Sequence, residues 1–159
     1  YSIEGSLPIL KKFHDLGVRY MTLTHTKTIP WADSATDEPK HGGLTEFGEE
    51  VIREMNRLGL LVDLSHVSPD TMRDALRVTT APVIFSHSST RALTDHPRNV
   101  PDDILKALPR NGGVVMINFF SAFIAPTAEL ARDKETRGTL AQVADHIDHA
   151  VRMAGIDHV

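Results

Sequence analysis

Apolar and polar residues follow one another along this chain in two periods, one typical of helices and one typical of strands. Residues 45–58, TEFGEEVIREMNRL, place apolar side chains three and four positions apart, which predicts an amphipathic helix that ends at Gly59. The same period predicts helices over 4–16, 69–78 and 139–154, and one that opens at Pro101 and ends before Asn111. Five helices are therefore expected.

Four shorter segments have the composition of strands: 18–25, 60–66, 82–88 and 113–120. The last three are almost continuously apolar, as expected for strands that are covered on both faces. Helices and strands thus alternate four times, which favours an α/β fold of parallel strands and crossover helices. An open sheet and a closed barrel both fit, but the sequence has neither of the common glycine-rich nucleotide-binding motifs.

Composition and charge narrow the class of protein. The chain has 159 residues, of which 41% are hydrophobic and 24% charged, as in globular domains. A net charge of −4 with scattered Lys and Arg argues against a nucleic-acid partner. The longest apolar run, 114–120, is too short to cross a membrane. The absence of Cys excludes disulfides and favours a reducing compartment such as the cytoplasm. Because the chain starts at Tyr1, we expect a missing N-terminus and leave the compartment open.

The candidate chemistry lies at strand ends, where His25, His66 and His87 stand at or near the ends of three predicted strands. The carboxyl ends of parallel strands carry the active site in such folds. Neutral imidazole is the commonest protein ligand for metals, and neighbouring strands lie only about 4.8 Å apart. A single His at a strand end is usually an ordinary polar residue, but three together indicate a metal or acid–base site. A zinc site needs at least three protein ligands, so two His do not complete one.

Several other residues have open interpretations. Asp63 either orients a ligand His or takes part in a structural ion pair. His146 and His149 have the i, i+3 spacing of a metal pair, but an ordinary solvated helix face is favoured. The serines around His87 favour local hydrogen bonding, because no G-x-S-x-G motif is present. Trp31 and Asp33 either line a pocket or have structural roles, and Phe119 and Phe120 either form an apolar pocket or cap the core. His96 and Asn99 are expected to shape the loop around Arg98 and not to touch the substrate.

Four segments together identify a family. TLTHTKTIPWADS, GLTEFGEEVIREMNRLGLLVDLSHVS, APVIFSHSSTRALTDHPRNVPDD and NGGVVMINFF resemble the membrane (renal-type) dipeptidases of peptidase family M19. The resemblance implies a (β/α)₈ TIM barrel of the amidohydrolase type, of which about four βα units are present, with two zinc ions. It implies that His66 and His87 are ligands of one zinc, that His25 faces the scissile carbonyl as a catalytic and substrate-binding residue, and that Arg98 binds the carboxylate of the dipeptide.

The sequence also departs from the family pattern. The H-x-D motif that holds the other zinc near the start of the family's barrel has no counterpart there, the bridging Glu would lie just before Tyr1, and the catalytic Asp would follow Val159. We therefore expect residues 1–159 to be a single domain, the central part of a metal-dependent hydrolase barrel that is truncated at both ends.

The resulting functional expectation is a zinc-dependent dipeptidase that cleaves its substrate through a metal-bound hydroxide. Two alternatives stay open. The chain by itself is a catalytically incomplete fragment, or the intact protein is another metal hydrolase of the amidohydrolase type that acts on lactones, cyclic amides or phosphate esters. A dipeptide is the expected partner, no transmembrane segment is expected in this part, and a homodimer is one option for the oligomeric state.

Overall fold

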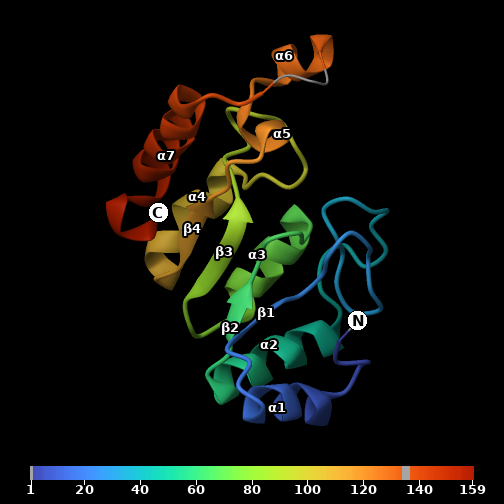
Figure 1. Cartoon of the computed structure of the whole chain (residues 1–159). Coiled ribbons are helices and arrows are strands. Elements are labelled where there is room, and N and C mark those ends of the chain that lie inside the picture. Colours follow the sequence, from blue (N-terminus) through green and yellow to red (C-terminus); the bar gives the residue numbers. More distant parts are fainter. Residues whose placement is uncertain (1, 134–136) are drawn as a thin grey trace. The chain divides into compact units, whose positions relative to one another are not determined.

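The structure is a computed structural model that describes residues 2–133 and 137–159. The fold divides into two compact units, residues 1–84 (unit 1) and 85–159 (unit 2), and the boundary falls inside strand β3 (Val83–Ser88). Figure 1 draws unit 1 in blue to green and unit 2 in yellow-green to red. The expectation of a single domain stays a prediction.

Unit 1 is an alternation of helices and parallel strands. Its elements are α1 (Leu7–Asp15), β1 (Tyr20–Thr22), α2 (Glu46–Leu58), β2 (Leu61–Asp63), α3 (Pro69–Val78) and the first residues of β3. β1 and β3 pair with β2 on either side, both in parallel, so that Thr22 lies opposite Asp63 and Asp63 opposite Ile84. Parallel strands joined by helices confirm the α/β class expected from the sequence.

The core of unit 1 follows the apolar period of its helices. Val51, Ile52 and Met55 of α2 are fully buried, at the three- and four-residue spacing that defines one helix face. α2 packs against α1 and against α3 (Figure 1). Val62 in β2 and Val83 in β3 are also buried, as expected for strands that helices cover.

The helix ends in unit 1 are set by capping residues. The Thr45 hydroxyl accepts a hydrogen bond from the Gly48 amide, and Gly59 ends α2 with a left-handed φ of 75°. The Ser68 hydroxyl accepts from the Thr71 amide, and Pro69 occupies the first turn of α3. These capping residues agree with the limits predicted for the helices over 45–58 and 69–78.

Unit 2 continues the alternation. After the last residues of β3 it contains α4 (Asp102–Asn111), β4 (Val114–Ile117), α5 (Ser121–Ile124), α6 (Thr127–Arg132), α7 (Leu140–Ala154) and a 3₁₀ turn at Ile156–His158. β4 lies next to β3. α7 packs against α4, α5 and β4 (Figure 1), and its N-terminus has a capping box between Thr139 and Gln142.

The predicted elements exist, but several limits differ. The first helix begins at Leu7 instead of residue 4, because Ser6 caps it and Gly5 has a φ of 71°. β1 and β2 have three residues each, so His25 and His66 lie three residues beyond their strands. The short helices α5 and α6 have no counterpart in the prediction, since four to six residues are too few to show a helical period.

A bilayer-spanning helix would have to be longer and more apolar than any helix found in residues 2–133 and 137–159.

Candidate functional site

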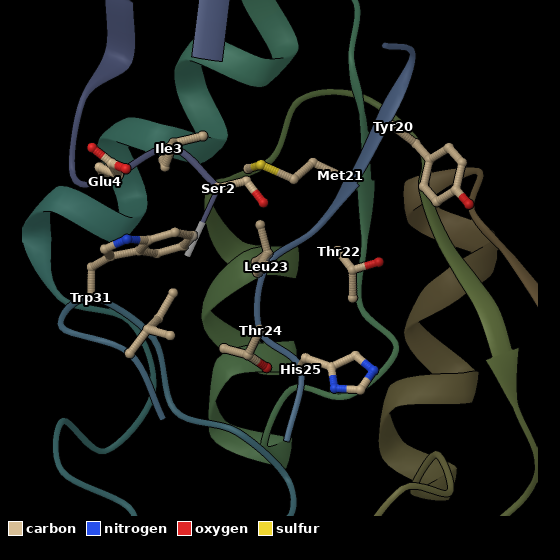
Figure 2. A pocket seen from close by; sticks show the side chains of 11 residues that line it. Ser2, Ile3, Glu4, Tyr20, Met21, Thr22, Leu23, Thr24, His25 and Trp31 are labelled. Atoms are coloured by element: carbon tan, nitrogen blue, oxygen red, sulfur yellow. The ribbon is translucent and has the colours of Figure 1, made fainter. Parts of the chain in front are cut away.

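A cavity of about 330 Å³ lies against β1 in unit 1. Its lining comes from residues 2–4, from the segment 20–25, and from Ile29 and Trp31. Figure 2 shows Met21 and Leu23 pointing toward Ile3 and Trp31, whereas Tyr20 and Thr22 point to the other side of the strand. Leu23 and Trp31 are buried, and Trp31 makes an edge contact with Phe47. Trp31 therefore both lines the cavity and belongs to the core.

His25 and His66 lie side by side in unit 1. Their ring centroids are 4.1 Å apart, with an angle of 25° between the ring planes. The parallel register explains this contact, because His25 and His66 each follow the paired residues Thr22 and Asp63 by three positions. His25 is exposed at the cavity, and its Nδ1 lies 2.8 Å from the Thr26 hydroxyl.

His87 has the same position relative to its strand, since it follows Ile84, the partner of Asp63, by three residues. It lies within β3, in unit 2. Its Nδ1 is 2.7 Å from the Ser86 hydroxyl, which confirms local hydrogen bonding as the role of this serine. A partner on one ring nitrogen fixes the orientation of an imidazole, as is usual for histidines that bind metals through the other.

The backbone of His66 is left-handed, with a φ of 73°. This conformation costs a residue with a side chain about 1–2 kcal/mol, so its surroundings must hold it. The carbonyl oxygen of His66 accepts hydrogen bonds from the Ala35 amide at 2.8 Å and from the Thr24 hydroxyl at 3.2 Å. The Ser34 hydroxyl lies 3.3 Å from the same oxygen and donates to the His25 carbonyl at 2.7 Å. These contacts join the backbones of both histidines to one turn.

Asp33 organises the long loop 26–43 that contains this turn. Its buried carboxylate accepts hydrogen bonds from the backbone amides of Lys40, His41 and Gly43. Burial by itself would raise the pKa of Asp33, but these amides outweigh it and hold the pKa below the ordinary value. Asp33 thus has a structural role, one of the two that the sequence left open.

Asp63 is fully buried at the end of β2. One carboxylate oxygen accepts from the Thr22 hydroxyl at 2.6 Å, and the other accepts from the Ser65 amide at 3.0 Å. The carboxylate therefore joins the ends of β1 and β2 directly before the segments that carry His25 and His66.

Arg98 lies in the loop 89–101 of unit 2 and is buried. Its guanidinium donates to the His87 carbonyl at 3.2 Å and lies 5.2 Å from the centre of the Phe123 ring. Nδ1 of His96 accepts from the Arg98 amide at 3.1 Å, and burial lowers the pKa of His96, with the charge of Arg98 adding to the effect. The Asn99 side chain accepts from the Ser89 amide and donates to the Thr94 and Phe123 carbonyls. His96 and Asn99 shape the Arg98 loop, as predicted.

The prediction of a solvated face for His146 and His149 is wrong for His146. Its side chain is buried between α7 and the loop 89–101, where it contacts Thr90 and Thr94. His149 lies nearer the surface of α7, and its Nε2 is 2.8 Å from a carboxylate oxygen of Asp102. The sequence shows the helical spacing of the two histidines, but it does not show which face of α7 lies in the interior.

Phe119 and Phe120, which follow β4, are largely exposed, so the described residues do not support a core-capping role. Phe120 makes an edge contact with Phe123. Ser34 and Thr24, which bond the backbones of the two histidines, are residues that the sequence did not single out. Ser34 shows only as a polar side chain in the loop 26–43, and Thr24 only as a polar side chain near the end of the predicted strand 18–25.

In residues 2–133 and 137–159, no three His, Cys, Asp or Glu side chains lie close enough together to hold a metal. The imidazoles of His66 and His87 have the donor type that zinc prefers, but two donors are too few for a zinc site. Their donor chemistry fits zinc, and further ligands would have to come from other residues.

Comparison with known proteins agrees with the resemblance that the sequence motifs show. The family model described as Membrane dipeptidase (Peptidase family M19) matches residues 1–159. An uncharacterized dipeptidase of Schizosaccharomyces pombe is 49% identical over 162 residues, a match that covers 100% of this chain and 38% of the relative. The chain thus spans well under half of that relative's length.

Two solved structures are similar in fold as well as in sequence. The probable dipeptidase PvdM from Pseudomonas aeruginosa matches with a TM-score of 0.90 and 26% identity, over 98% of this chain and 53% of that one. A metallo peptidase from Rhodobacter sphaeroides, solved with a phosphinate mimic of the dipeptide L-Ala-D-Ala, matches with a TM-score of 0.83 and 29% identity. That match covers 97% of this chain and 45% of the other.

Proposed function

Because this chain belongs to the membrane dipeptidase family, peptidase family M19, we propose that the full-length protein is a zinc-dependent dipeptidase. The observation that carries the proposal is the row of paired residues Thr22, Asp63 and Ile84, each followed three positions later by a histidine. When bound, zinc would lower the pKa of a water molecule toward neutrality and so would supply the nucleophile for hydrolysis of the peptide bond.

The proposed roles of the residues in this chain are those that the family resemblance implies, and the chemistry of each side chain is compatible with its role. His66 and His87 would each hold zinc through one imidazole nitrogen. His25, exposed at the cavity and stacked on His66, donates a hydrogen bond to the oxygen of the scissile carbonyl as negative charge develops there. Arg98 binds the free carboxylate of the dipeptide, because a planar guanidinium matches a carboxylate with two parallel hydrogen bonds.

Hydrolysis of a panel of dipeptides by the full-length protein tests this function. We expect cleavage that a chelator abolishes and that added zinc restores. The panel also contains a lactone, a cyclic amide and a phosphate ester. Turnover of one of these without turnover of any dipeptide would replace the proposal with one of the other hydrolase activities.

Arg98→Ala tests the assignment of the carboxylate-binding residue. Loss of a buried charge-assisted pair costs about 2–3 kcal/mol, which corresponds to a fall of about 30- to 150-fold in kcat/KM. We expect most of this fall to come from KM, since the contact is made in the ground state as well as the transition state. Arg53→Ala is the matched control, because Arg53 bonds Glu49 on the surface of α2. Unchanged dipeptide kinetics in Arg98→Ala would show that the assignment is wrong.

A further inference from the structure

His146 is a buried imidazole in the middle of α7, with 1% of its surface exposed. Its ring reaches Thr90 and Thr94 in the loop 89–101 and the end of α5 at Ile124. These partners stand 22 to 56 positions away in the sequence. A polar ring that is buried so completely is costly unless both nitrogens are hydrogen-bonded, and here both are.

The partners assign the protonation state of the ring. The backbone amide of Thr90 lies 3.1 Å from Nδ1, and because an amide N–H can only donate, Nδ1 must be the unprotonated acceptor. The proton of the neutral ring is then on Nε2, which lies 3.3 Å from the Ile124 carbonyl oxygen. The Thr94 hydroxyl, also 3.3 Å from Nε2, donates to the Ala125 carbonyl and so can accept from the ring. Burial lowers the pKa of His146, which agrees with a neutral imidazole.

The loop that His146 contacts is the one that carries Arg98. Asn99 donates to the carbonyl of Thr94, and it accepts from Ser89 at the start of the loop. Thr94 therefore links His146 to Asn99, because its hydroxyl bonds the ring and its backbone carbonyl accepts from Asn99, which follows Arg98 in the chain. Asn99 and Arg98 also share Phe123, the first through its carbonyl and the second through its ring.

We propose that His146 is a positioning residue that holds the loop 89–101, and with it Arg98, as a neutral imidazole protonated on Nε2. It touches no substrate and acts through the Thr90 and Thr94 contacts. The inference rests on the proposed function, in which the Arg98 guanidinium binds the substrate carboxylate. A misplacement of that guanidinium weakens binding of the carboxylate and leaves the reacting groups in place.

The test compares kinetics of the full-length protein on one dipeptide and on the same dipeptide amidated at its C-terminus. His146→Leu removes the hydrogen bonds of both ring nitrogens and puts an apolar side chain of similar size in their place. We expect KM for the free dipeptide to rise about tenfold, equal to about 1.4 kcal/mol, with kcat nearly unchanged and the amide almost unaffected. His149→Ala, on the same helix, is the control. A fall in kcat alone, equal for both substrates, would reduce His146 to a purely structural residue and overturn the inference.

Two further variants keep the inference testable if His146→Leu does not fold. His146→Asn retains an acceptor near the Thr90 amide and should recover most of the affinity for the free dipeptide. Thr94→Val removes the hydroxyl between the ring and the Ala125 carbonyl at nearly constant volume, and should raise KM in the same selective way. In the Arg98→Ala background, His146→Asn and Thr94→Val should have no additional effect on KM, because both act through Arg98. Additive effects would contradict the proposed path.

The outcomes separate this inference from the function on which it rests. A wild-type protein without dipeptide hydrolysis would refute the proposed function and with it the role of His146. An active protein that responds to Arg98→Ala but not to the His146 and Thr94 variants would refute the inference alone. Nitrogen chemical shifts of the His146 ring provide a readout that needs no activity, and a protonated Nδ1 would contradict the assigned form.

Discussion

The backbone of His66 is left-handed, a conformation in which glycine would have the lowest conformational energy. The Thr24 and Ala35 contacts to its carbonyl hold the conformation, and the ring lies against His25. Strain of this kind persists where the surrounding structure over-determines it, and such positions cluster at functional sites. The conformational free-energy cost at His66 is therefore consistent with a functional role for its ring.

A pair of variants isolates this strain. His66→Gly and His66→Ala both remove the imidazole, but only alanine keeps the unfavourable backbone. We expect the glycine variant to be the more stable by about 1 kcal/mol, as measured by urea unfolding. Both should lack activity. Equal stability of the two variants would show that the backbone at this position relaxes without cost.

Asp33 supplies a second prediction at the scale of one residue. Its pKa is lower in the folded chain than the ordinary value of 3.8. The ionised carboxylate therefore stabilises the fold above that value, and this contribution is lost as the pH falls through the lowered pKa. Asp33→Asn should cost about 2 kcal/mol at neutral pH, because hydrogen bonds to a charged acceptor are lost.

The measurement is the midpoint of urea unfolding at pH 7 and at pH 3. The difference between wild type and Asp33→Asn should shrink at the lower pH, because the carboxylate of the unfolded chain is then largely protonated and the unfolded state is favoured. Asp15→Asn is the control, since Asp15 pairs with Lys11 at the surface and should matter much less. A difference that stays constant with pH would mean that the carboxylate charge is not what stabilises the loop.

At the scale of elements, the long loop and helix α3 meet at Gly43. Its φ is 127°, and a Cβ atom there would collide with the Asp74 carboxylate and approach the Asp70 backbone to 3.2 Å. The Asp74 carboxylate also accepts from the Leu44 amide. The loop thus passes so close to α3 that only glycine fits.

Gly43→Ala should destabilise the fold by about 3 kcal/mol, the sum of backbone strain and overpacking. Gly42→Ala is the matched control, because Gly42 also has a positive φ but has open space around its Cβ position. We expect it to cost only about 1 kcal/mol. Thermal unfolding of the two variants checks the prediction, and equal losses would show that the Asp74 side chain moves aside freely.

The limits of helices can be predicted from the sequence more accurately than the limits of strands. Thr45, Gly59, Ser68 and Gly155 mark helix ends through local chemistry, and all four are capping residues in the structure. Strand length and the burial of His146 depend instead on contacts between residues far apart in the sequence. The apolar period of α7 predicts the helix. It does not predict that a polar ring lies on the interior face of α7, where Thr90 and Thr94 form hydrogen bonds with it.

At the scale of the whole molecule, this chain contains part of the expected site. His25, His66, His87 and Arg98 could be named from their motifs, and no structural finding tests their roles. The sequence offers no metal ligand beyond His66 and His87 that could be named, and the described residues hold no cluster of three His, Cys, Asp or Glu. Family membership and the parallel α/β fold are confirmed by the comparisons.

The isolated chain should therefore differ from the full-length protein. With two imidazoles assigned to zinc and no cluster of three ligands in the described residues, we expect it to bind zinc weakly and to hydrolyse no dipeptide. Zinc analysis after dialysis, together with a dipeptide assay, measures both. Stoichiometric zinc with turnover in the isolated chain would contradict the division of the site that the family pattern implies.

The loop 26–43 has one more consequence, for the rate at which its amide hydrogens exchange with solvent. It has no helix and no named strand, yet the amides of Lys40, His41 and Gly43 are bound to Asp33, and that of Ala35 to the His66 carbonyl. Amides held in this way exchange only when their hydrogen bonds open. The loop should therefore be as protected as the helices beside it, and its exchange should report on the backbone that holds His66.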